Sequence, residues 1–260
     1  MKLRVLGCSG SDLPGHRLTS FLVNQTILLD AGTVTYALSL EKQAAITDIF
    51  VSHPHLDHIK DILFLADNLI EFFASNERPP VNIRGLPQVI DSIAEHLLND
   101  TIWPDFTAIP RHAPVLTYKT MLPGEPCRVN GLTVTAFPVN HARSASGYVL
   151  QGDKPGENLA YTGDTGPQNA FWESLAALAF PVKNLITEAS FPNSMEELAL
   201  ASKHLTPALL RRELEKLPYT PKIFIYHMKS PFSAQIQADL QRDLSGFAYH
   251  LMREEETLRF

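Results

Sequence analysis

The sequence is poor in three features that would each have pointed to a particular class of protein. It has two cysteines, Cys8 and Cys127, which lie far apart in the sequence, so we expect free thiols and a reducing, cytoplasmic environment. No apolar run reaches the roughly 18 residues of a membrane-spanning helix, and the first strand is too short and too soon interrupted, at Gly7, for a secretory signal. Positive charge is also scarce, with 22 Lys and Arg against 28 Asp and Glu and a net charge of −6. We therefore expect no membrane partner and a poor fit to a long nucleic acid.

The composition predicts a globular protein with a sizeable core. The chain has 260 residues, of which 45% are hydrophobic, and this favours one domain over residues 1–260. Apolar runs and alternation predict strands at residues 3–6, 20–23, 26–29, 49–51, 81–84, 126–129, 133–138, 148–150, 158–162, 184–188 and 222–226. Helical spacing predicts helices at residues 62–73, 89–99, 170–178, 194–201 and 207–217, and prolines indicate a loop-rich stretch between 104 and 126. The pattern taken alone predicts a mixed α/β protein.

The most informative segment is SHPHLDHI, residues 52–59, which follows the apolar run 49–51. It places three imidazoles and a carboxylate within six residues: His53, His55, Asp57 and His58. These are ligand types that zinc and manganese accept. Such a group at the end of a buried strand is expensive to desolvate without a cation. The competing interpretation is a surface loop that happens to be rich in histidine.

Three further polar residues favour the metal site. His141, Asp164 and His227 each follow a predicted strand, so their side chains can converge at one edge of the sheets. Either histidine alone would more often be structural. The three together, in this order and at strand ends, indicate additional ligands.

The order H-x-H-x-D-H resembles the signature of the metallo-β-lactamase superfamily. The resemblance extends over the whole chain and implies an αββα sandwich, in which two stacked sheets have helices outside. It also implies two divalent metal ions, with zinc favoured and manganese or iron as alternatives. One ion would bind His53, His55 and His141, the second would bind Asp57, His58 and His227, and Asp164 would bridge them.

A Glu–His pair narrows the resemblance to the phosphodiesterase branch. Glu188 and His204 match the positions of that pair, and a histidine oriented by a carboxylate can protonate a departing alkoxide. The metals would generate a hydroxide that attacks phosphorus, and Asp57 would orient it. The competing interpretation is that His204 merely flanks the helix that starts near Pro207.

Within this branch the chain resembles class II 3′,5′-cyclic-nucleotide phosphodiesterases. The matching segments are residues 53–59, 99–106, 188–191 and 204–207. The rival is tRNase Z, an RNA 3′-processing endonuclease with a long arm after its third motif. Here Asp164 follows His141 by 23 residues, which leaves no room for that arm. We expect a binuclear hydrolase that cleaves a small phosphodiester, with cyclic AMP or GMP favoured. A non-catalytic scaffold with the same fold is the alternative from another class.

The sequence departs from the family motif at one position, and four further residues are candidates for substrate binding. Asp61 stands where the family motif usually has glycine, so a carboxylate near the metals could weaken phosphate binding or contact a second-shell histidine. Arg143 and Lys229 lie two residues beyond the ligands His141 and His227 and are candidates to hold substrate. Trp103 and Phe106 are candidates for a nucleobase wall. A homodimer is compatible with the sequence.

Overall fold

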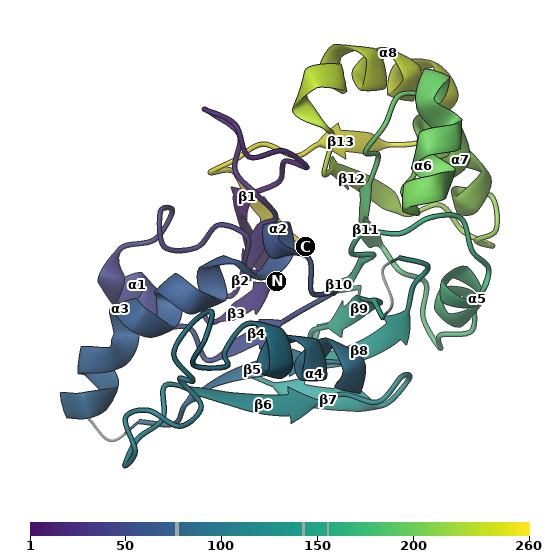
Figure 1. The fold of residues 1–260 in the computed structure, drawn as a ribbon. Helices are drawn as coiled ribbons and strands as arrows, with labels where there is room; N and C mark the ends of the chain where they lie inside the picture. Colours follow the sequence, from purple (N-terminus) through teal and green to yellow (C-terminus); the bar gives the residue numbers. More distant parts are fainter. Residues whose placement is uncertain (76–77, 142–143, 155) are drawn as a thin grey trace.

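The computed structural model describes residues 1–75, 78–141, 144–154 and 156–260. Two seven-stranded sheets lie face to face, with helices on their outer sides (Figure 1). The predicted αββα sandwich is therefore confirmed. In the part of the chain that the structure describes, no helix combines the length and the apolarity needed to cross a membrane.

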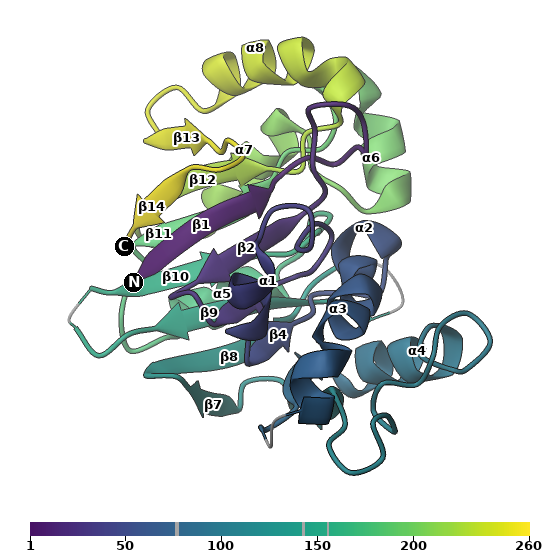
Figure 2. The same ribbon diagram turned by 90° about the vertical axis from the view of Figure 1, so that its left-hand side faces the viewer.

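The first sheet has the order β14-β1-β2-β3-β4-β5-β6. Its strands are β1 (Lys2–Gly7), β2 (Ser20–Val23), β3 (Ile27–Leu29), β4 (Asp48–Phe50), β5 (Val81–Gly85), β6 (Leu116–Thr120) and β14 (Thr257–Arg259). The helices of this half are α1 (Leu40–Ala44), α2 (Leu56–Ile59), α3 (Asp61–Ser75) and α4 (Pro87–His96). Figure 2 shows β14 beside β1, which joins the two ends of the chain.

The second sheet has the order β13-β12-β11-β10-β9-β8-β7. Its strands are β7 (Pro126–Val129), β8 (Leu132–Pro138), β9 (Ser146–Gln151), β10 (Asn158–Tyr161), β11 (Asn184–Glu188), β12 (Lys222–Tyr226) and β13 (Tyr249–Leu251). The helices of this half are α5 (Ala170–Ala176), η1 (Asn193–Met195), α6 (Glu196–Ser202), α7 (Pro207–Leu214), η2 (Ser230–Phe232) and α8 (Ser233–Asp243). Each sheet has three antiparallel pairs at one end and three parallel pairs at the other, with the ends reversed between the two strand orders. The two halves thus repeat one plan.

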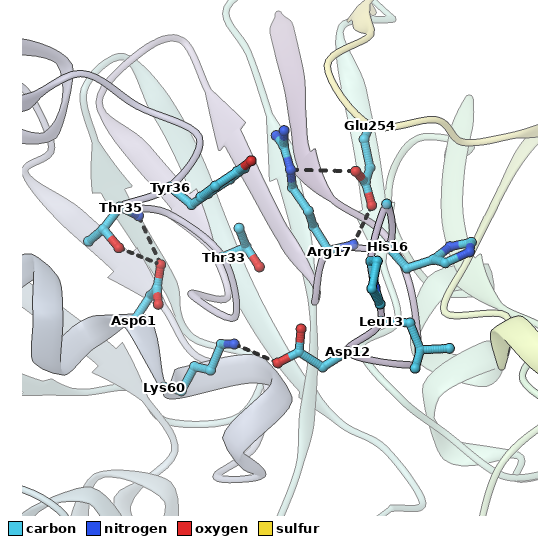
Figure 3. A pocket seen from close by; sticks show the side chains of 12 residues that line it. Asp12, Leu13, His16, Arg17, Thr33, Thr35, Tyr36, Lys60, Asp61 and Glu254 are labelled. Carbon is cyan, nitrogen blue, oxygen red and sulfur yellow. Dashed lines mark hydrogen bonds and ion pairs between the residues drawn. The ribbon is translucent and has the colours of Figure 1, made fainter.

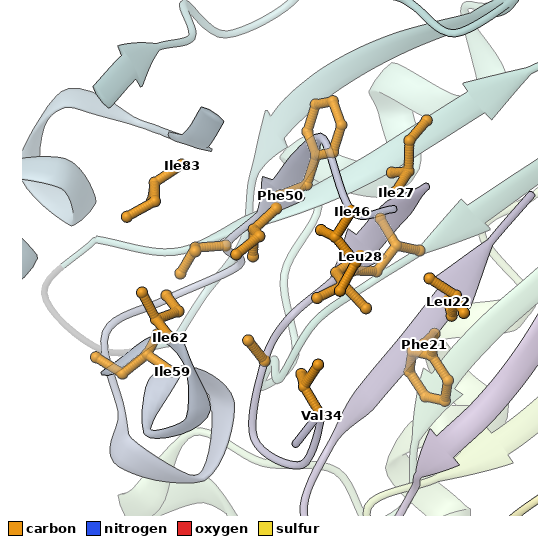
Figure 4. Packing of buried hydrophobic residues seen from close by; sticks show 14 of the residues in the cluster. Phe21, Leu22, Ile27, Leu28, Val34, Ile46, Phe50, Ile59, Ile62 and Ile83 are labelled. Carbon is orange, nitrogen blue, oxygen red and sulfur yellow. The ribbon is translucent and has the colours of Figure 1, made fainter. Parts of the chain in front are cut away.

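The side chains of a strand alternate between its two faces, and this explains the apolar runs inside the central strands. In β12, Phe224 and Tyr226 face the first sheet, whereas Ile223 and Ile225 face the outer helices. A strand that is buried on both faces needs apolar residues at every position. Figure 4 shows part of the inner cluster, with Phe21 and Phe50 among its residues. This two-sided burial holds the strand ends, and the polar residues that follow them, in fixed positions.

The sequence located the central strands and the edge strand β7 well but missed the other three edge strands, β6, β13 and β14. The predicted helix 89–99 is α4 (Pro87–His96), which begins earlier because Pro87 occupies its first turn. The 194–201 prediction divides into η1 and α6. The stretch expected to be loop-rich contains β6, and α1, α8, β13 and β14 were not predicted. The strands β13 and β14 are three-residue segments with no buried residue, so they carry no apolar signal.

The outer core offers a test of the fold that leaves the polar site untouched. Trp172 on α5 is 1% exposed and packs against Phe171. Replacing it by alanine should lower the free energy of unfolding by about 3–5 kcal/mol, because a large cavity remains. Urea denaturation measures this change. Leu122→Ala, at a position that is 51% exposed, is the control and should change stability by less than about 0.5 kcal/mol. Equal effects of both substitutions would contradict the packing described here.

Candidate metal centre and its surroundings

All seven predicted ligands lie at the carboxyl ends of strands or in the segments that follow. His53 and His55 stand between β4 and α2, and Asp57 and His58 are on α2. The other three follow β8, β10 and β12: His141, Asp164 and His227. These ends meet where the two sheets face each other, so the fold brings together residues that are up to 174 positions apart.

The first group consists of His53, His55 and His141. One ligand atom from each lies within 4.8 Å of the others, and His141 Nε2 is 3.3 Å from His55 Nδ1. Burial lowers the pKa of all three imidazoles below the ordinary value. The rings are therefore neutral at physiological pH, which is the form that binds a metal.

The second group consists of Asp57, His58, Asp164 and His227, again with ligand atoms within 4.8 Å of one another. His227 Nε2 is 3.3 Å from Asp57 Oδ2 and 3.2 Å from Asp164 Oδ2, and His58 Nε2 is 3.4 Å from the same Asp164 oxygen. Burial alone would raise the pKa of Asp164, but His227 and His58 overcome this effect and lower it well below its usual range. Both groups can thus hold a divalent cation.

Two observations show that the residues fit a metal. His53 Nε2 and His58 Nε2 are buried and form no hydrogen bond of acceptable geometry with any described residue, and a buried imidazole nitrogen without such a bond is costly. The opposite nitrogen, Nδ1, is engaged in each ring: with Ser52 Oγ at 3.0 Å for His53 and with Asp30 Oδ2 at 2.7 Å for His58. His141 Nδ1 similarly contacts the Lys203 carbonyl at 2.8 Å, and His227 Nδ1 contacts Ser190 Oγ at 3.0 Å. Metal-ligating histidines usually have their second nitrogen held in this way.

Asp30 is a functional residue that the sequence analysis missed. Its buried carboxylate contacts His58 Nδ1 and accepts hydrogen bonds from the backbone N–H of Ser52 at 2.6 Å, the Ser52 hydroxyl at 2.6 Å and the Tyr161 hydroxyl at 2.5 Å. An aspartate directly after the apolar strand 26–29 was the available signal, because a lone carboxylate at the end of a buried strand needs partners.

The predicted Glu188–His204 pair is present. His204 Nδ1 lies 2.8 Å from Glu188 Oε1, and the fully buried Glu188 also accepts from the backbone N–H groups of Thr165 and Leu205 and from the Ser190 hydroxyl. Burial alone would lower the pKa of His204, but the Glu188 carboxylate outweighs this effect and raises it. The ring stacks on His227 with centroids 5.6 Å apart, so it lies beside the second group.

Asp61 does not point at the cluster as a free carboxylate. Its Oδ2 accepts hydrogen bonds from the backbone N–H of Val34 at 2.5 Å and of Thr35 at 2.8 Å, and from the Thr35 hydroxyl at 3.1 Å. These hydrogen bonds run to the loop after β3 and not to a histidine, which was one of the two roles considered for Asp61. Asp61 instead anchors the loop that follows β3.

The four substrate-binding candidates differ in their exposure and contacts. Phe106 is 1% exposed in the inner core, so it offers no face to a nucleobase. Trp103 is partly buried and packs against Phe64, with ring centroids 5.3 Å apart. The Lys229 ammonium donates to the Gly10 carbonyl at 2.7 Å. Arg143 lies outside the described residues.

Comparisons with known proteins agree with this geometry. A profile of the family described as cAMP phosphodiesterases class-II matches residues 31–235. The chain is 30% identical over 194 residues to 3′,5′-cyclic-nucleotide phosphodiesterase 1 of Saccharomyces cerevisiae, covering 66% of this chain and about half, 51%, of that protein. It is 27% identical over 254 residues to 3′,5′-cyclic-nucleotide phosphodiesterase of Aliivibrio fischeri, covering 82% and 74%.

Solved structures confirm the fold. Unliganded yeast PDE1 superposes with a TM-score of 0.83 at 19% identity, over 100% of this chain and 99% of that chain. The metallo-β-lactamase fold protein YhfI from Bacillus subtilis superposes with a TM-score of 0.76 at 16% identity, over 99% and 98%. The profile match covers most of the chain, from the loop after β3 into α8. The chain therefore belongs to the class-II cAMP phosphodiesterase family.

Proposed function

We propose that the protein is a metal-dependent phosphodiesterase that hydrolyses a small phosphodiester, with 3′,5′-cyclic AMP or GMP favoured. The observation that carries the proposal is the buried Glu188–His204 pair beside a seven-residue ligand cluster. The names of the yeast and Aliivibrio relatives support the choice of cyclic nucleotides.

The proposed ligand set provides for two divalent ions. His53, His55 and His141 would hold one, Asp57, His58 and His227 would hold the other, and Asp164 would contact both. Zinc is favoured because five imidazoles and two carboxylates suit it, with manganese or iron as alternatives. When bound, the ions would lower the pKa of a water molecule and withdraw negative charge from the phosphate.

The chain's own residues supply orientation and protons. Asp57 is the partly open carboxylate of the second group, with its side chain 28% exposed, and it would align the attacking water. Glu188 fixes the His204 ring through Nδ1, so the opposite nitrogen, Nε2, is the atom that would deliver a proton to the leaving oxygen. Departure of a ribose alkoxide at neutral pH requires such a donor.

The substrate class can be tested directly. The metal-loaded protein should hydrolyse cyclic AMP or cyclic GMP much faster than it cleaves a precursor tRNA, because the proposed site serves one small phosphodiester. Turnover numbers for the three substrates under identical conditions provide the comparison. Accurate cleavage at a tRNA 3′ end without cyclic-nucleotide turnover would refute the proposal and favour the endonuclease. A metal-free protein that turns over none of these substrates would favour a scaffold.

The number of bound metal ions should reflect the two ligand groups. Wild-type protein should carry about two ions per chain, and chelation should abolish hydrolysis. His58→Ala should lose mainly one ion and most activity, because it removes one ligand of the second group. Elemental analysis of both proteins measures this loss. His250→Ala is the matched control, since His250 lies on β13 and pairs with Glu256 outside the ligand groups; its metal content should equal that of wild type. A metal-free wild-type protein that is insensitive to chelators would exclude the binuclear site.

The role of His204 should depend on the leaving group. His204→Ala should slow hydrolysis of an alkyl phosphodiester about 10²–10⁴-fold, whereas a bis-nitrophenyl ester, whose leaving group needs no proton, should lose far less. Glu188→Gln should show a weaker form of the same pattern, because Glu188 orients and charges the imidazole. Metal content, measured in parallel, should stay unchanged. Equal losses on both substrates would assign His204 to phosphate binding or structure. Loss of metal would make it a ligand, as its proximity to His141 and Asp164 allows.

A further inference from the structure

A cavity of about 530 Å³ opens beside α2. Ligand pockets usually measure about 300–1,000 Å³, so a nucleoside fits. The walls are the loop 12–17, the loop 33–36, Lys60 at the end of α2, Asp61 at the start of α3, and Glu254. In Figure 3, Tyr36 and Arg17 approach each other on one side, and Lys60 reaches Asp12 on the other.

Three walls of this cavity are formed by chain segments that lie next to the residues of the ligand cluster. The loop 12–17 follows Gly10, where an added Cβ would lie 2.9 Å from His227 Nδ1. The loop 33–36 follows Gly32, where an added Cβ would lie 2.0 Å from the Asp57 carbonyl oxygen. Lys60 comes two residues after His58. Both glycines are therefore required for close approach, and the walls of the cavity pack directly against the segments that carry the ligands.

The charged groups of the cavity already have partners. Lys60 Nζ lies 2.9 Å from Asp12 Oδ2, and Arg17 is paired with Glu254 at 3.5 Å and with Glu255. Among the charged lining residues, two cations face three carboxylates. The cavity therefore offers no net positive charge to a phosphate. It suits a neutral group that carries hydroxyls and ring nitrogens.

Tyr36 gives the cavity an aromatic surface. Its side chain is 80% exposed, which is unusual for a large ring, and the Arg17 guanidinium lies 4.7 Å from the ring centroid. Every nucleobase has a π-face that can stack on such a ring. The hydroxyls of Thr33 and Thr35 line the same cavity and can bond to sugar or base.

We infer that this cavity receives the nucleoside part of a cyclic nucleotide whose phosphate is held at the metal cluster, with Tyr36 as the stacking surface for the base. The inference rests on the proposed function and narrows it. The carboxylates disfavour a second phosphate, so the site selects phosphodiesters of a single nucleoside over polynucleotides. Tyr36 thus takes the place that the sequence analysis assigned to Trp103 and Phe106.

Steady-state kinetics with cyclic AMP test the stacking surface. Tyr36→Ala should raise KM about 5- to 100-fold, the range for losing one base–aromatic stack, with little change in kcat. Tyr36→Phe keeps the ring and should restore a KM near that of wild type. Phe64→Ala is the matched control, because Phe64 is 46% exposed and contacts Trp103; its KM should be unchanged. All variants should keep the wild-type kcat with methyl nitrophenyl phosphate, which lacks a nucleoside.

A second measurement tests the charge of the cavity. Asp12→Asn leaves Lys60 without its partner, so the ratio of kcat/KM for the dinucleotide pApA to that for cyclic AMP should rise about two- to fivefold. A ratio that stays constant or falls would overturn the selection against a second phosphate.

The remaining outcomes separate this inference from the proposed function. An unchanged KM in Tyr36→Ala, with cyclic AMP turned over normally by wild type, would overturn the inference alone. A raised KM in Phe64→Ala, with an unchanged KM in Tyr36→Ala, would show that the base binds beside Trp103 and not on Tyr36. A wild-type protein that hydrolyses methyl nitrophenyl phosphate but no cyclic nucleotide would overturn the proposed function, and this inference with it.

Discussion

Two buried carboxylates, Asp30 and Glu188, control the orientation of four imidazoles. Asp30 contacts His58 directly and reaches His53 through the Ser52 hydroxyl. Glu188 contacts His204 directly and reaches His227 through the Ser190 hydroxyl. Each carboxylate thus fixes one ring itself and a second ring through a serine. Without these carboxylates neither the tautomer nor the orientation of each imidazole would be fixed, and the Nε2 atoms would not converge on one site. The sandwich supplies one such anchor at the strand ends of each sheet.

Site residues were predictable when neighbouring sequence positions marked them, and were missed when only the fold gave them a role. His53, His55, Asp57 and His58 are close together, so local sequence identified them, and His141, Asp164 and His227 were recognisable because each follows an apolar strand. Ser52 and Ser190 were not recognisable as relays. A serine beside a histidine is common, and its role depends on a carboxylate that only the fold brings near, such as Asp30, 22 positions from Ser52. Phe106 shows the opposite limit: an aromatic residue in a matching segment proved to be core.

The central strands were predictable from the sequence and the cavity was not, because only the strands carry a local apolar signal. Burial on both faces produces apolar runs at residues 49–50 in β4, 185–186 in β11 and 223–226 in β12. The cavity instead arises from loops whose residues, such as Tyr36 and Arg17, are ordinary surface types until the fold sets them side by side. Those loops meet the ligand segments at Gly10 and Gly32 and through the Lys60–Asp12 ion pair. The residues proposed for specificity and those proposed for metal binding therefore lie on different stretches of chain that pack closely together.

Lys203 connects two functional histidines through a single residue. Its backbone is left-handed, with φ of 56°, its carbonyl holds His141 Nδ1, and the next residue is His204. In the proposed mechanism, His141 belongs to the first metal group and His204 is the proton donor. In thermodynamic terms, occupancy of that metal group and alignment of the donor are then linked quantities, and each stabilises the other by the same free energy.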